Sequence, residues 1–141
     1  MKRTSALLAS LVLSLSTTNA VADTSALFIG NSFTYGHGSA ARFYRADTVT
    51  DLNNQGIGGV PALFKSFTDQ AGLDYDVYLE TQPGSGLDYH LENKLGVIGR
   101  RPWDQVVMHG FSTLNRTEPG NSELLVSTTQ QMTEFLQGIN P

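Results

Sequence analysis

A serine stands where a short apolar stretch meets a glycine turn near the start of the chain. Residues 26–29 are all apolar and predict a buried β-strand, and Gly30 then permits a sharp turn. Asn31 and Ser32 follow at a place where a helix can begin. A serine hydroxyl there lies near backbone N–H groups that can stabilise an oxyanion, so Ser32 is a candidate nucleophile. The pattern is also typical of an ordinary helix N-cap, and the residues alone favour that interpretation over the catalytic one.

A catalytic serine also needs a base, because its hydroxyl is a weak nucleophile until an imidazole takes its proton. The sequence holds three histidines, His37, His90 and His109. His37 lies past the turn that carries Ser32, so its ring need not face the hydroxyl. Triad partners usually arrive from separate loops on one edge of a sheet, and we therefore expect none of the three to act as the general base.

Two later stretches combine a strand pattern with polar or glycine residues at its end. Residues 76–80 alternate polar and apolar side chains, which predicts a strand, and the glycine-rich turn 84–86 comes soon after. Residues 106–108 are continuously apolar, as in a parallel strand covered on both faces, and His109 and Ser112 follow. A buried, hydrogen-bonded structural histidine is an equally good interpretation of His109.

The run Leu27-Phe28-Ile29-Gly30-Asn31-Ser32-Phe33-Thr34 resembles the first sequence block of the SGNH (GDSL-type) hydrolases. It is similar to the branch that has Gly-Asn-Ser in place of Gly-Asp-Ser. In that family this serine is the nucleophile of esterases, lipases, thioesterases and carbohydrate deacetylases. The resemblance therefore implies that Ser32 is the nucleophile.

The turn after residues 76–80, with Leu-x-x-His behind it, resembles the second block of the same family. There, a glycine at the strand end donates its backbone N–H to the oxyanion. Gly84 matches that position best and Gly86 is the next choice. Gly59 is the alternative if residues 54–59 form the second block instead.

Residues 103–112 resemble the third block, in which a polar residue just past the strand completes the oxyanion hole. The usual Gly-x-Asn-Asp is absent, and His109 and Ser112 are the polar residues available in place of its asparagine. The fifth block of the family, Asp-x-x-His, supplies the general base and does not occur after the third block here. We therefore expect an N-terminal part of an SGNH hydrolase that lacks its base and is inactive or weakly active as it stands.

The order of predicted elements is strand, helix, strand, helix, strand, helix, which indicates a three-layer α/β/α sandwich with a parallel sheet of the SGNH or flavodoxin type. Residues 51–59 predict a loop, and residues 61–72 predict a helix with Leu63, Phe64 and Phe67 on one side. The sheet is expected to be truncated after the third strand and its helix, which leaves that strand at an edge.

Residues 1–22 predict a signal peptide rather than part of the fold. Lys2 and Arg3 precede a short apolar run, and Ala20-Val21-Ala22 fits the small-x-small cleavage pattern. The run is too short to cross a bilayer, so no membrane span is expected after cleavage. The mature domain, residues 23–141, is expected to be periplasmic or secreted.

The charge and the cysteine content of the chain exclude some classes of partner and of metal site. Removal of residues 1–22 takes away two basic residues and no acidic one, so the net charge changes from −4 to −6. An acidic chain with no basic cluster argues against nucleic acid as a partner. The sequence has no cysteine, which excludes disulfides and thiolate metal sites.

These features predict an exported serine hydrolase that cleaves an acyl ester, a lipid or an acetylated carbohydrate through Ser32, with no cofactor and no metal. Two other classes remain open. An SGNH-like binding domain would hold an acyl or sugar group without cleaving it, and a flavodoxin-like module would cradle a phosphate at residues 31–34. Trapping of Ser32 by a fluorophosphonate favours the hydrolase, whereas a tightly bound flavin favours the flavodoxin-like module.

Overall fold

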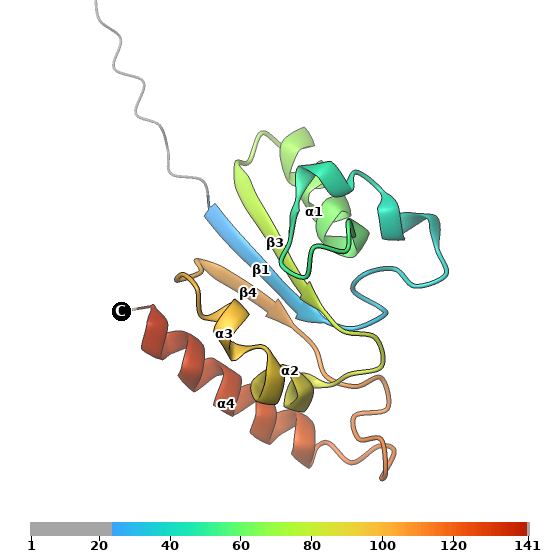
Figure 1. Cartoon of the computed structure of the whole chain (residues 1–141), viewed down its shortest axis with the longest axis vertical. Helices are drawn as coiled ribbons and strands as arrows, with labels where there is room; N and C mark the ends of the chain where they lie inside the picture. Colours follow the sequence, from blue (N-terminus) through green and yellow to red (C-terminus); the bar gives the residue numbers. More distant parts are fainter. Residues whose placement is uncertain (1–23, 141) are drawn as a thin grey trace, which may run out of the picture.

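The computed structural model describes residues 24–140, and the signal peptide predicted over residues 1–22 lies outside them. Four parallel strands form one sheet in the order β2-β3-β1-β4. Figure 1 shows β3, β1 and β4 side by side. The strands are β1 (Thr24–Gly30), β2 (Thr50–Asp51), β3 (Tyr75–Thr81) and β4 (Gln105–Met108). The helices are α1 (Gly59–Gln70), α2 (Leu87–Asn93), α3 (Leu95–Ile98) and α4 (Glu123–Ile139), with 3-10 helices η1 (Ala40–Phe43) and η2 (Ala46–Thr48).

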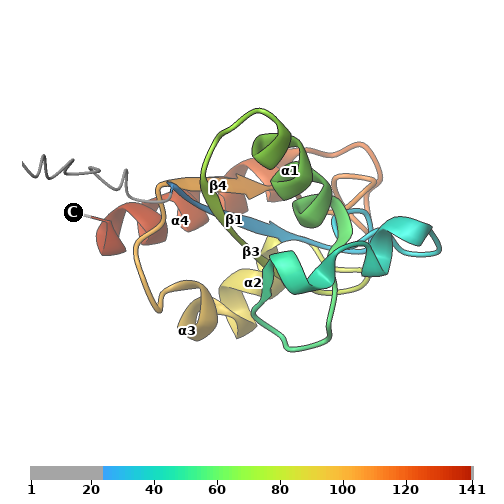
Figure 2. The same ribbon diagram turned by 90° about the horizontal axis from the view of Figure 1, so that it is seen from above.

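Strand β1 forms the centre of the core because helices cover it on both faces. Ala26 and Phe28 point to the side of α1, whereas Leu27 and Ile29 point to the side of α2, α3 and α4. The first core contains Ala26, Phe28, Tyr35, Ile57, Val77 and Leu79, and the second contains Leu27, Ile29, Leu87, Ile98, Trp103 and Met132. The predicted α/β class with a parallel sheet between helices is therefore confirmed, and Figure 2 shows the helical layers from above.

Strand β4 lies at an edge of the sheet, as the sequence predicts. Val107 points to the opposite face from Val106 and Met108 and is 50% exposed, while Val106 and Met108 pack toward the core that includes α4. Helix α4 places Met132 in that core, with Phe135 beside it. Among the described residues, no helix is long and apolar enough to cross a membrane.

Three details differ from the predictions. The two-residue strand β2 (Thr50–Asp51) is not expected from the sequence; it pairs with β3 and is too short to show a periodic pattern. Helix α1 begins at Gly59 rather than Pro61, and the proline is tolerated because N–H groups of a first helical turn have no intrahelical partner. Phe67, which is predicted on one side of this helix with Leu63 and Phe64, is 65% exposed: the buried side of α1 instead follows Ala62 and Ser66, four residues apart.

Candidate functional site

The ends of three strands meet at one edge of the sheet. Because β3, β1 and β4 are adjacent and parallel, the segments that follow them leave the sheet on the same side. The chain passes from β1 to β3 over one face and from β3 to β4 over the other, which makes the gap between β1 and β4 a topological switch point. Such crevices are where open α/β sheets bind ligands. The three sequence blocks singled out above thus lie at one edge.

The side chain of Asn31 joins these three segments. Its amide Nδ2 donates to the carbonyl of Ser85, at 2.8 Å, and to the carbonyl of Gly110, at 3.2 Å. Its Oδ1 accepts from the backbone N–H of Phe33 at 3.1 Å. Asn31 is 2% exposed, and both polar atoms of its buried side-chain amide have hydrogen-bond partners. This single residue fixes the turn after β1 to the loops after β3 and β4.

Ser32 lies between Asn31 and Phe33, whose backbone N–H donates to the Asn31 side chain. It is half-buried, and its carbonyl accepts from the backbone N–H of His37 at 2.9 Å, which closes the turn. Within the described part of the chain, no hydrogen bond joins the Ser32 hydroxyl to another residue. The hydroxyl therefore lies at the switch point, and none of residues 24–140 is bonded to it as a base would be.

Two of the histidines are engaged close to the Ser32 turn. The Nδ1 of His37 contacts the Tyr35 hydroxyl at 3.2 Å. The Nε2 of His109 contacts Thr34 Oγ1 at 2.5 Å, and its Nδ1 donates to the carbonyl of Gly110 at 3.0 Å. A Cβ on Gly30 would lie 2.6 Å from that Nε2, so the glycine makes room for this link between β1 and β4. His109 thus holds the two strand ends together, in keeping with the structural alternative for it.

The predicted oxyanion residues occupy different places at this edge. Gly84 is exposed with a φ of +64°, and its carbonyl accepts from the Arg116 guanidinium. Gly86 is buried and stands immediately before α2. Gly59 begins α1, and a Cβ there would lie 2.6 Å from the Thr34 carbonyl, so it packs on the turn that carries Ser32. Ser112 is exposed in the loop after β4. The oxyanion role of each stays a prediction.

A buried polar cluster that the sequence did not indicate lies beneath the loop after β3. Glu80, at the end of β3, is fully buried, and its Oε2 contacts Nδ1 of His90 on α2. The Nε2 of His90 contacts the hydroxyl of Ser85 at 3.2 Å. The other carboxylate oxygen of Glu80 accepts from Asn53 Nδ2 at 3.0 Å and lies 3.6 Å from Lys94 Nζ. Three side chains, from α2, from the residue after α2 and from the loop after β2, thus surround one carboxylate.

The surroundings of Glu80 keep it ionised. Burial opposes the charged form and by itself raises the pKa of this carboxyl group. The hydrogen bond and the charge of His90, the Asn53 amide and the Lys94 ammonium act in the opposite direction, and together they lower the pKa of Glu80 below its ordinary value of 4.5. Glu80 is therefore a carboxylate at neutral pH.

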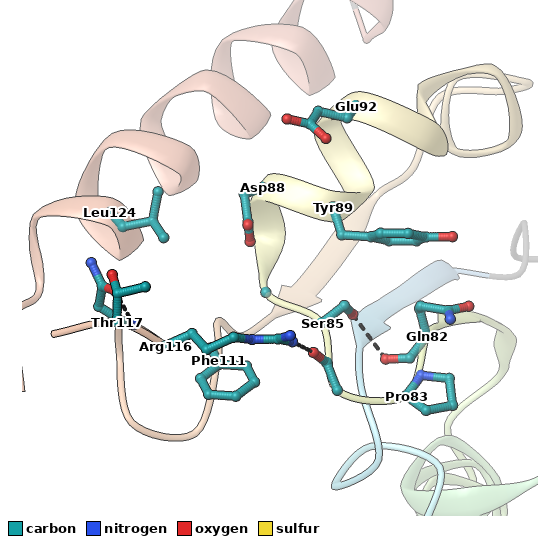
Figure 3. A pocket seen from close by; sticks show the side chains of 13 residues that line it. Gln82, Pro83, Ser85, Asp88, Tyr89, Glu92, Phe111, Arg116, Thr117 and Leu124 are labelled. Carbon is teal, nitrogen blue, oxygen red and sulfur yellow. Dashed lines mark hydrogen bonds between the residues drawn. The ribbon is translucent and has the colours of Figure 1, made fainter. Parts of the chain in front are cut away.

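A pocket of about 530 Å³ opens between α2 and the loop after β4 (Figure 3). Tyr89 and Glu92 border it on the α2 side, and Phe111 and Arg116 border it on the other, with the guanidinium 4.9 Å from the Phe111 ring centre. Ser85 also lines the pocket, but among the described residues Ser32 does not. The pocket is adjacent to the switch point and presents aromatic and charged groups.

Comparison of the chain with protein-family models, with curated proteins and with solved structures finds no significant match, so the fold and the geometry of this edge carry the assignment of function.

Proposed function

We propose that this chain forms the nucleophile-bearing part of an SGNH-type serine esterase, with Ser32 as the nucleophile. The observation that carries the proposal is the Asn31 amide, which ties the loops after β3 and β4 to the turn that holds Ser32. A nucleophile and its oxyanion donors must reach one reacting carbonyl, so they have to come from loops fixed against each other. The described residues provide such a frame, although they do not supply its base.

The reaction requires Ser32 Oγ to attack the ester carbonyl while an imidazole takes its proton. The alcohol leaves with that proton, and water then hydrolyses the acyl-serine. His37, His90 and His109 each direct ring nitrogens to groups other than Ser32. We therefore propose that an Asp-x-x-His segment outside these 141 residues supplies the base, as in the family that the sequence resembles.

The test is Ser32→Ala in a version of the protein that carries such a base, measured with p-nitrophenyl acetate. Loss of a triad nucleophile costs on the order of 10⁶ in kcat. Ser127→Ala is the matched control, because Ser127 is an exposed serine on α4 and bonds only within its helix. Turnover of Ser32→Ala within a few-fold of the control would overturn the assignment.

A second candidate, a non-catalytic binding domain, is favoured by the pocket beside the switch point. The pocket is lined by Tyr89, Phe111 and Arg116 but not, within the described residues, by Ser32. A binding domain would retain affinity for small acyl or sugar esters in Ser32→Ala and lose it in Arg116→Ala. Calorimetric titration of the two variants separates this function from that of an esterase.

A further inference from the structure

The buried cluster of Glu80, His90 and Ser85 has the residue types of a catalytic triad, so its proton positions decide what it can do. Ser85 is 6% exposed, His90 is 1% exposed and Glu80 is fully buried. A serine beside an imidazole that is held by a carboxylate is the arrangement of serine hydrolases. In those enzymes, however, the imidazole nitrogen next to the serine accepts the hydroxyl proton.

Counting donors places the protons differently here. The Ser85 hydroxyl has a single proton, and it donates that proton to the carbonyl of Gln82 at 2.8 Å, since a carbonyl can only accept. The contact between Ser85 Oγ and His90 Nε2 at 3.2 Å then requires Nε2 to be the donor. The other ring nitrogen, Nδ1, faces Glu80, whose second oxygen accepts from Asn53 Nδ2 and lies beside Lys94 Nζ, as suits an ionised carboxylate; Nδ1 therefore donates as well. Both ring nitrogens of His90 therefore carry protons.

A doubly protonated His90 cannot accept the proton of Ser85. The ring is instead an imidazolium paired with a buried carboxylate, and its second N–H holds Ser85 in place. Asn53 and Lys94 complete the coordination of Glu80, so the negative charge is matched from two sides. Breaking a buried pair of this kind leaves an uncompensated charge, which makes the geometry of the cluster stiff.

The cluster is connected to Ser32 through two further hydrogen bonds. The carbonyl of Ser85, whose hydroxyl His90 holds, accepts from Asn31 Nδ2 at 2.8 Å. Asn31 then holds the N–H of Phe33, so both neighbours of Ser32 are fixed by one amide. A displacement of the loop after β3 is thus passed directly to the turn that carries Ser32.

We propose that His90 is a positioning residue: a buried imidazolium that, held by Glu80, anchors Ser85 and thereby seats Asn31 and Ser32 against each other. The inference that His90 positions Ser32 for reaction rests on the proposed function. The protonation of His90 and the coupling to Asn31 do not, and they are tested without any enzymatic activity.

The first test is nitrogen NMR of the chain with ¹⁵N-labelled histidine at neutral pH. Signals are assigned with His37→Gln and His109→Gln, which leave the cluster intact. We expect both ring nitrogens of His90 to show the signature of protonated nitrogen. A lone-pair nitrogen at Nε2 would overturn the proposal, because His90 could then act as a base toward Ser85.

The second test measures the coupling to Asn31 with Ser85→Ala, which removes the anchored hydroxyl but keeps the carbonyl that Asn31 binds. This variant removes only one oxygen, so it keeps the test valid if substitutions of His90 unfold the chain. We expect hydrogen exchange of the Asn31 side-chain amide to accelerate by about tenfold or more, as expected when a local hydrogen-bonded unit opens more readily. An unchanged exchange rate would overturn the positioning role.

The third test uses the base-carrying version and separates the role in catalysis from the proposed function. Ser85→Ala is expected to lower kcat by up to about 10²-fold with little change in KM, as for a small misplacement of reacting groups. An unchanged kcat, while Ser32→Ala is inactive, would overturn the positioning role and leave the esterase assignment standing. Hydrolysis that survives Ser32→Ala but is lost in Ser85→Ala would overturn both assignments.

Discussion

Two serines follow adjacent parallel strands of this protein, and they are held in opposite ways. Ser32, after β1, is half-buried with a hydroxyl that bonds to no described residue. Ser85, after β3, is buried and has both a carbonyl acceptor and a histidine at its hydroxyl. The comparison shows that proximity to a histidine and a carboxylate is not enough to identify a nucleophile. What matters is which atom holds each proton, and the Ser85 proton is committed to Gln82.

The largest effect on stability is expected where the buried cluster loses its charge balance. Glu80→Gln leaves the His90 imidazolium buried without a counter-charge, and we expect a loss of about 3–5 kcal/mol in the free energy of unfolding. The control is Asp104→Asn, since Asp104 also accepts from a buried residue, Ser25, at 2.6 Å but is itself exposed. Urea denaturation should give a far smaller change for the control. Similar changes in both variants would show that the cluster is not the stiff part of this edge.

A smaller loss of stability is expected when the Asn31 amide, which joins the turns that carry Ser32 and Ser85, is replaced. Asn31→Asp replaces the donor to the carbonyls of Ser85 and Gly110 by an acceptor, so each carbonyl loses its partner. Leaving a buried polar group unpaired costs about 1–3 kcal/mol. Asn115→Asp is the control, because the described hydrogen bonds of the Asn115 side chain are all accepted by its Oδ1, from Thr117 and Glu118, and an aspartate keeps this acceptor. Thermal unfolding that does not distinguish the two variants would contradict the joining role of Asn31.

The smallest expected effect is a pH dependence of stability that comes from Glu80, in the buried cluster that holds Ser85. The lowered pKa of Glu80 means that the unfolded chain binds more protons than the folded chain in mildly acidic solution. The stabilisation is complete above the ordinary carboxyl value of 4.5 and is lost as the pH falls through the lower folded value. We expect the stability difference between the wild type and Glu80→Gln to shrink over that range. A difference that does not shrink at any pH below 4.5 would contradict the assignment.

The sequence alone predicts which strand ends come together at the candidate site. A continuous apolar strand before Ser32 and parallel alternation of strands and helices predict that the three strand ends share an edge, and the structure has this arrangement. The edge position of β4 also follows from the order of elements. These features depend on patterns within single elements and on the short list of topologies that parallel strands allow.

The buried cluster could not be predicted in the same way. Residues 76–80 alternate polar and apolar side chains, and that pattern places Glu80 on an exposed face together with Asp76. Helices cover both faces of this parallel sheet near β1, so Glu80 is instead enclosed and depends on His90, Asn53 and Lys94. The only signal in the sequence was Glu80 at the end of a strand and His90, ten residues later, in the motif Leu-x-x-His. Pairing these two residues requires knowledge of the turn between them.

The identity of the nucleophile is tested most directly by mapping a fluorophosphonate adduct. The base-carrying version is incubated with the reagent, digested and analysed by mass spectrometry, with Ser32→Ala and Ser85→Ala treated in parallel. We predict an adduct on Ser32 in the wild type and in Ser85→Ala, and none in Ser32→Ala, because the Ser85 hydroxyl donates its proton to Gln82, whereas no described residue binds the Ser32 hydroxyl. An adduct on Ser85 would contradict both the choice of nucleophile and the protonated state of His90.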